Sequence, residues 1–350
     1  MISYKRLLTW KYLKHTDTEV SDIMQYLPKS RKTLWTSSVR LGLLDILSSM
    51  SLDKDDFIFL PAIAPQGLVL PLQKKKVACQ FYHLKEKFDV DLKSIESFVN
   101  NGRCKAIFFI HYFGKFNPQI YDVKRLCDAH GALLIEDFVH GLFGVDDKMR
   151  PLGSIGDLSF CSLPKFLPVP DGALLFINND KLQVTLNEKK SIIWSVSVLS
   201  GTISLLLNNV ASKCKRKWQY HLINTCAKLH YAIYYKLLCG LRYNHPVSKV
   251  TNNILRHIDF EMFIEERNTA FDLINEKYKC FEAAFMSPGY PIISPDAQTE
   301  RAKWKNKGVE TLSYIKGWQY VPASSDYDFE RELQLSHFLL PLNAKVLSCQ

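Results

Sequence analysis

The chain has 350 residues, of which 47% are hydrophobic and 23% are charged. This composition supplies enough apolar surface for a large domain and a smaller one, and it excludes a largely disordered chain. Lys and Arg number 45 against 35 Asp and Glu, a surplus of ten positive charges. Such a surplus favours an anionic partner: a phosphate cofactor, a nucleotide-linked substrate or an acidic membrane surface. No helix-turn-helix or zinc-finger spacing occurs, which argues against nucleic acid.

The cysteines and the N-terminus both favour a cytoplasmic location. Nine cysteines are scattered along the chain without a C-x-x-C pair, which is typical of reduced thiols rather than of disulfides or a zinc site. The N-terminal stretch MISYKRLLTWKYLKH lacks the apolar core of a signal peptide. We therefore expect a cytoplasmic protein without a resident metal ion.

Strand-like and helix-like segments alternate between residues 35 and 180. Helical apolar faces fall within 41–47, 92–99 and 120–127, and Gly131 is placed to end the last of these helices. Apolar runs typical of strands buried on both faces lie at 57–60, 106–113, 132–138, 158–163 and 173–178. This alternation predicts right-handed crossovers and a mainly parallel sheet flanked by helices.

The second half of the chain differs in composition. A helical, aromatic-rich and basic insertion is expected around 185–245, within a large domain that spans 1–260, and a small α+β domain is expected over 261–350. Residues 191–212 carry no charge and precede the basic run KCKRK, as in a membrane helix, but they contain several Ser, Thr and Asn. A buried or interface helix is favoured here, and a weak membrane-surface contact or a span are the alternatives.

Residues with chemical potential gather after two of the predicted strands. Glu136 and Asp137 end one strand, His140 follows three residues later, and Lys165 follows another strand. Ligands of open α/β sheets bind at the carboxyl ends of the strands. Pyridoxal 5′-phosphate (PLP) needs an amine for its aldehyde and a carboxylate that keeps its ring nitrogen protonated. Taken singly, these residues also fit a capping Asp, a partly buried His and a surface Lys.

Four short motifs in this region carry a family resemblance. They are EDFVH (136–140), GSIGD (153–157), FCSLPK (160–165) and DGA (171–173). In this order and spacing they resemble the DegT/DnrJ/EryC1/StrS family of PLP-dependent nucleotide-sugar aminotransferases. The resemblance implies the PLP-dependent transferase type I fold, like that of aspartate aminotransferase, with a seven-stranded, mainly parallel sheet.

The resemblance also assigns roles to individual residues. Lys165 would be the Schiff-base lysine, Asp137 would pair with the pyridine nitrogen, and His140 would lie beside the ring. Ser162 would contact the phosphate. The start of the first helix, at Ser38, Val39 and Arg40, would contribute further phosphate contacts.

Two positions depart from the family pattern. Val39 stands where the family has a glycine, and a valine adopts a positive φ poorly. The segment 61–66 (PAIAPQ) lacks the aromatic residue that often stacks on the cofactor ring. Both departures predict weaker cofactor binding.

The function implied by the resemblance is transamination. Glutamate would donate the amino group, and a nucleotide-linked keto-sugar would receive it, in polysaccharide or secondary-metabolite biosynthesis. A homodimer would form the site at its interface, with help from residues of the partner within 190–245. Two alternatives stay open: a PLP-dependent lyase, dehydratase or amino-acid-directed transferase, and a PLP-fold protein with little catalysis that acts through binding. The lysine at 165 argues against the sugar dehydratases of the family, which have a histidine there.

Overall fold

In the computed structural model, the described residues are 20–99, 102–282, 284–312, 319–343 and 346–347. The N-terminal stretch 1–19, on which part of the expected cytoplasmic location depends, lies outside them.

A seven-stranded sheet forms the centre of the molecule, in the order β1-β8-β7-β6-β5-β2-β4. Its strands are β1 (Lys32–Thr36), β2 (Phe57–Pro61), β4 (Ala78–Tyr82), β5 (Cys104–Ile110), β6 (Leu133–Asp137), β7 (Leu158–Ser162) and β8 (Ala173–Ile177). The five strands from β4 to β7 are mutually parallel, while β8 is antiparallel to both β7 and β1. The link between β7 and β8 is too short for a helical crossover, so the chain returns in the opposite direction. The predicted mainly parallel sheet is confirmed, with this one reversal.

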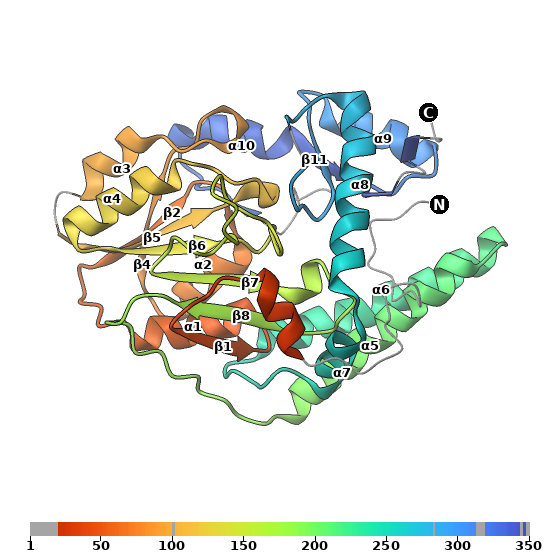
Figure 1. Ribbon diagram of the computed structural model, residues 1–350, viewed down its shortest axis with the longest axis horizontal. Coiled ribbons are helices and arrows are strands. Elements are labelled where there is room, and N and C mark those ends of the chain that lie inside the picture. The colour runs from red at the N-terminus through yellow and green to blue at the C-terminus, as the bar shows by residue number, and fades with distance from the viewer. Residues whose placement is uncertain (1–19, 100–101, 283, 313–318, 344–345, 348–350) are drawn as a thin grey trace.

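Helices cover both faces of the sheet. They are α1 (Val39–Ser49), α2 (Gln66–Lys74), α3 (Leu92–Val99) and α4 (Ile120–His130), and Figure 1 shows α1 and α2 on one side and α3 and α4 on the other. Short 3-10 helices lie at Val20–Tyr26, Glu86–Phe88, Tyr112–Gly114, Leu163–Lys165 and Ser325–Tyr327. Gly131 caps α4 with φ at 70°, as the sequence predicts. Since helices cover both faces, the central strands are almost entirely buried, and most of their side chains are apolar.

The C-terminal part has a hydrophobic core of its own. The elements that build it are α8 (Phe260–Tyr278), β9 (Tyr290–Ile293), α9 (Ala297–Asn306) and β11 (His337–Leu340). Strands β9 and β11 pair antiparallel over a cluster that contains Phe271, Tyr290 and Phe338. Helices α7 (Lys249–His257) and α10 (Asp328–Leu335) pack on other clusters. The short strand β10 (Gln319–Tyr320) forms a separate two-stranded sheet with β3 (Ala64–Pro65), which follows β2. The predicted domain boundary after residue 260 coincides with the start of α8 and stays a prediction.

The predicted helical insertion is a hairpin of α5 (Ile192–Lys213) and α6 (Lys217–Gly240). Figure 1 shows it projecting from the body of the molecule, with the turn between the two helices at its far end. By length and composition α5 is apolar enough to cross a membrane, yet only 28% of its most apolar window is buried. A helix buried inside the chain is therefore wrong for most of the surface of 191–212, whereas the interface helix, the membrane-surface contact and the span stay predictions.

Candidate active site

One cavity of about 420 Å³ brings the predicted site residues together at the carboxyl ends of the parallel strands. All seven of them line it: Ser38, Val39, Arg40, Asp137, His140, Ser162 and Lys165. They come from α1, β6, β7 and the loops that follow these strands. The condition set by the sequence, that an amine and a carboxylate share one site, is met because Lys165 and Asp137 line the same cavity.

Asp137 is the last residue of β6, and its side chain is only 3% exposed. One carboxylate oxygen accepts a hydrogen bond from the backbone N–H of Val139 at 2.9 Å. Burial raises the pKa of Asp137 to about 6, although this hydrogen bond and the charge of Lys165 act in the opposite direction. A cationic group in the cavity would therefore stabilise the ionised carboxylate.

Glu136 points to the other side of the strand and has a structural role. Its carboxylate accepts hydrogen bonds from the backbone N–H groups of Gly153, Ile155 and Gly156 at 2.7 to 3.0 Å, and it contacts His111 Nε2 at 3.0 Å. Burial by itself raises the pKa of Glu136, but these hydrogen bonds outweigh burial and hold the pKa below its usual value. The first acid of the EDFVH motif thus fixes the GSIGD turn, and the second faces the cavity.

Lys165 ends the short 3-10 helix after β7, and its Nζ lies 2.9 Å from Nε2 of His140. His140 is buried, and burial together with the nearby Lys165 charge lowers its pKa well below the usual value. The imidazole is therefore neutral, so its Nε2 accepts the hydrogen bond that the lysine ammonium donates. This contact orients the amine inside the cavity.

The N-terminus of α1 provides an anion-binding edge. Ser38 caps the helix in an extended conformation, and its Oγ accepts a hydrogen bond from the N–H of Leu41. N–H groups in the first turn of a helix lack the acceptor one turn earlier, so those of Val39 and Arg40 can meet an anion. Val39 begins the helix and is not among the described residues with a positive φ, so this position does not need the conformational freedom of a glycine. The expected weakening of cofactor binding by the valine side chain stays a prediction.

Arg40 adds a guanidinium to the same edge. It donates to Sγ of Cys239 at 2.6 Å and to the hydroxyl of Tyr235 at 3.3 Å, both on α6. Its buried Nε has no hydrogen-bond partner among the described residues. An anionic ligand could therefore use the donor capacity that Arg40 retains.

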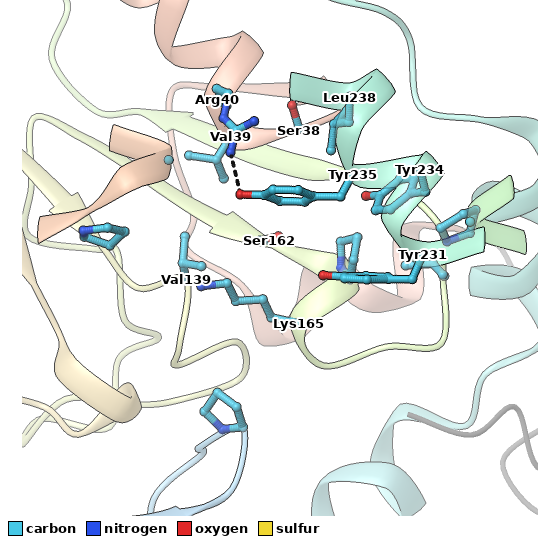
Figure 2. A pocket seen from close by; sticks show the side chains of 18 of the residues that line it. Ser38, Val39, Arg40, Val139, Ser162, Lys165, Tyr231, Tyr234, Tyr235 and Leu238 are labelled. Carbon is cyan, nitrogen blue, oxygen red and sulfur yellow. Dashed lines mark hydrogen bonds between the residues drawn. The ribbon is translucent and has the colours of Figure 1, made fainter. Parts of the chain in front are cut away.

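The sequence predicts that residues within 190–245 help to form the site, but from a partner subunit; in the structure, α6 of the same chain lies there. Its tyrosines Tyr231, Tyr234 and Tyr235 line the cavity, as does Lys228. Figure 2 shows Tyr231 and Tyr235 extending from α6 above the Lys165 side of the cavity, with Tyr235 bonded to Arg40. The two rings are nearly parallel, at an interplanar angle of 19° and a centroid distance of 6.4 Å. The i, i+4 spacing of these tyrosines is a signal that could have found them, and they supply the aromatic surface that 61–66 lacks.

This set of groups fits PLP. An amine and a buried carboxylate whose pKa is raised lie in one cavity, and a helix N-terminus with an arginine lies beside them. Among the described residues, no group of three His, Cys, Asp or Glu side chains could hold a metal ion. The amine, the carboxylate and the helix N-terminus with its arginine are groups that an organic phosphate such as PLP can engage.

Comparison with known proteins identifies the family. Residues 21–199, just over half of the chain, match the DegT/DnrJ/EryC1/StrS aminotransferase family. The chain belongs to this family, as its motifs predict. GDP-perosamine synthase of Vibrio cholerae is 24% identical over 173 residues, a match that spans 49% of this chain and 45% of that protein.

Solved structures show the same fold over nearly the whole chain. An aminotransferase of this family from Brucella abortus has a TM-score of 0.61 at 14% identity and covers 97% of this chain and 90% of its own. PseC from Helicobacter pylori, an aminotransferase involved in pseudoaminic acid biosynthesis, has a TM-score of 0.61 at 15% identity, with coverage of 98% and 92%. DesV of S. venezuelae has a TM-score of 0.63 at 13% identity, with coverage of 97% and 87%. The predicted fold class is confirmed.

Proposed function

We propose that this protein is a PLP-dependent aminotransferase that transfers an amino group to the keto-sugar of a nucleotide sugar. The observation that carries the proposal is the shared cavity of Asp137 and Lys165 beside the N-terminus of α1. Membership of an aminotransferase family supports it. The names of GDP-perosamine synthase and PseC support a sugar as the substrate class.

Four groups in the cavity would hold the cofactor. Lys165 would bind the aldehyde carbon, Asp137 the pyridine nitrogen, and the N-terminus of α1 with Ser38, Arg40 and Ser162 the phosphate. When bound, PLP supplies the electron sink that makes the carbon next to the substrate nitrogen acidic. Burial raises the pKa of Asp137 to about 6, so a neighbouring cation such as a protonated ring nitrogen would stabilise its ionised form.

The proton transfers would be carried out by Lys165. Its Nζ would take the proton from the substrate carbon that carries the nitrogen and deliver it to the former aldehyde carbon of the cofactor, on the other side of that nitrogen, which requires the neutral amine. His140 is the group that receives the hydrogen bond of Lys165, and burial keeps this imidazole neutral. His140 therefore positions the amine without competing for the proton.

The cavity offers cations and aromatic surface for the substrate. Arg40 and Lys228 line it and suit a diphosphate, while Tyr231 and Tyr235 present ring faces that suit the flat ring of a cofactor or a nucleobase. An amino acid, glutamate by our expectation, would donate the amino group. A homodimer and a cytoplasmic location belong to the same proposal.

Reduction of the PLP adduct tests the proposal. The protein mixed with PLP should develop an absorption band near the visible edge, and borohydride should fix the cofactor on Lys165 in a peptide map. Lys228→Ala removes the other lysine that lines the cavity and should leave the adduct unchanged, whereas Lys165→Ala should abolish it. An adduct on any other lysine, or failure to bind PLP, would contradict the assignment.

Half-reactions with amino acids then test the reaction type. The PLP form should convert to the amine form with glutamate, and a nucleotide-linked keto-sugar should restore the PLP form. If no amino acid brings about this conversion although PLP is bound, transamination is wrong, and lyase or binding roles on the same fold take its place.

A further inference from the structure

The positive charge of this protein is concentrated in one stretch of the chain. Residues 189–258 contain eleven Lys and Arg and no Asp or Glu. Without these eleven, the rest of the chain has 34 Lys and Arg against 35 Asp and Glu. The whole basic surplus therefore belongs to the segment that carries the α5–α6 hairpin and to the residues next to it.

The face that α5 turns toward α6 consists of small, polar residues. Ser197 donates to the carbonyl of Tyr234 at 3.2 Å, Ser200 to that of His230 at 3.0 Å, and Ser204 to that of Ala227 at 2.8 Å. A Cβ on Gly201 would lie only 3.0 Å from the ring of Tyr234, so the two helices are close at this point. These three serines make 191–212 look too polar for a lipid-facing helix, but their hydroxyl groups find hydrogen-bond acceptors inside the hairpin.

The outward face of the hairpin is apolar instead. On α5, Ile192, Val196, Leu199, Leu206 and Val210 follow helical spacing along one stripe and are 45 to 84% exposed. On α6, Trp218, Leu222, Leu229 and Ile233 form a second stripe, 39 to 61% exposed. Small residues between helices and large apolar residues outside are the arrangement found in helices that contact lipid.

The turn at the far end of the hairpin is cationic. Lys213, Lys215, Arg216 and Lys217 are all exposed there, and the largely exposed Trp218 follows them (Figure 1). Clusters of Lys and Arg beside apolar and Trp side chains bind the headgroup region of anionic bilayers. For this outward face of the hairpin, a second copy of the chain is a less suitable partner, because a two-fold interface there would bring two such acid-free surfaces together. The homodimer of the proposed function would therefore form through other surfaces of the chain.

We infer that the α5–α6 hairpin is a peripheral anchor that binds the surface of an anionic phospholipid bilayer. The apolar stripes enter the interface between headgroups and acyl chains, and the basic turn contacts the headgroups. The opposite side of α6, with Tyr231 and Tyr235, lines the candidate active site. The anchor therefore places the cavity close to the membrane surface.

Vesicle flotation of the full chain tests the anchor. The protein should float with phosphatidylcholine vesicles that contain phosphatidylglycerol and should remain in the bottom fraction with phosphatidylcholine alone. Molar salt, which shortens the Debye length from about 8 to about 3 Å, should release it. Flotation that persists in molar salt would show that the contact is a span or purely apolar, and would overturn the peripheral, charge-dependent anchor.

Two matched pairs of variants locate the contact. Lys213→Gln, Lys215→Gln and Arg216→Gln together should weaken binding to anionic vesicles on the order of a hundredfold, because each cation contributes about fivefold near such a surface. The same change at Lys303, Lys305 and Lys307, exposed residues of α9 and its C-terminus, should have almost no effect. Equal loss in both triple variants would show non-specific charge attraction and would overturn the assignment to the hairpin.

The second pair tests the apolar stripes. Leu199→Gln with Leu206→Gln should weaken binding by about tenfold or more, since both leucines are over half exposed and leave water on binding. Leu273→Gln with Leu335→Gln, exposed positions on α8 and α10, is the control and should bind as the unmodified protein. If the Leu199 and Leu206 changes instead turn a dimer into a monomer, and the unmodified protein ignores vesicles, the stripes are a subunit interface and the anchor is wrong.

Discussion

The central sheet and the α5–α6 hairpin bury opposite kinds of residue. In the sheet, apolar side chains fill both faces, and the charged groups lie at the strand ends, where Glu136 has four hydrogen-bond partners. In the hairpin, Ser197, Ser200 and Ser204 are buried, whereas Leu199, Leu206, Leu222 and Leu229 are exposed. Apolar faces keep water out of the sheet, while exposed leucines on the hairpin suit a neighbour less polar than water, such as the membrane surface that we propose.

The largest expected effect concerns the amine at the sheet edge. Lys165→Ala should lower the rate of transamination by about a thousandfold or more, because the group that binds the cofactor and moves the proton is lost. Single-turnover measurements with glutamate check this prediction. Lys228→Ala, on the hairpin side of the same cavity, should keep the chemical step close to that of the unmodified protein. An equal loss of rate in the two variants would contradict the assignment of the proton transfer to Lys165.

A change at Glu136 should mainly lower stability. Glu136→Gln keeps the size of the side chain but brings an NH2 group toward several N–H donors, so we expect a loss of about 3 kcal/mol in the free energy of unfolding. Urea denaturation of the cofactor-free protein measures it. An unchanged midpoint would mean that the GSIGD turn does not depend on this carboxylate.

The neighbouring acid should behave in the opposite way. The pKa of Asp137 rises from 3.8 to about 6 on folding, so its ionisation destabilises the folded state as pH increases through this window. Relative to the unmodified, cofactor-free protein, Asp137→Asn should therefore gain up to about 3 kcal/mol between pH 4 and pH 7. Urea titrations at the two pH values provide the test. A difference that does not change with pH would show that the carboxylate already has a cationic partner.

The smallest expected effects on stability come from substitutions on the two faces of α5, the serine face toward α6 and the exposed leucine face. Ser197→Leu inserts a large side chain where Ser197 is 1% exposed, and it should cost about 1 to 3 kcal/mol through overpacking. Leu199→Ser removes a side chain that is 59% exposed and should change stability in water by less than about 0.5 kcal/mol. Thermal unfolding of both variants compares them. The reverse order would show that the serine face is not the packed face of the hairpin.

Local patterns were sufficient for much of the site. Apolar periodicity and turn residues act over a few residues. They predict the strands, the end of α4 at Gly131 and the two acids at the end of β6. The parallel strands then bring Asp137 and Lys165 to the same edge, and the motif order links them to one family. The sequence could not show that Tyr231 and Tyr235 reach this cavity, because α6 is distant along the chain and only its packing brings it there.

The strands of the sheet, the strand-end positions of the amine and the carboxylate, and the family can all be predicted from the sequence, because each depends on short runs of neighbouring residues. Two features can be seen only in the folded chain: which acid of the Glu136–Asp137 pair faces the cavity, and which face of α5 is buried. The former depends on the sheet register, and the latter on the contacts with α6. The composition of α5 is the same whichever face is turned inward. Only the packing of α5 on α6 therefore determines which side chains of the hairpin are exposed.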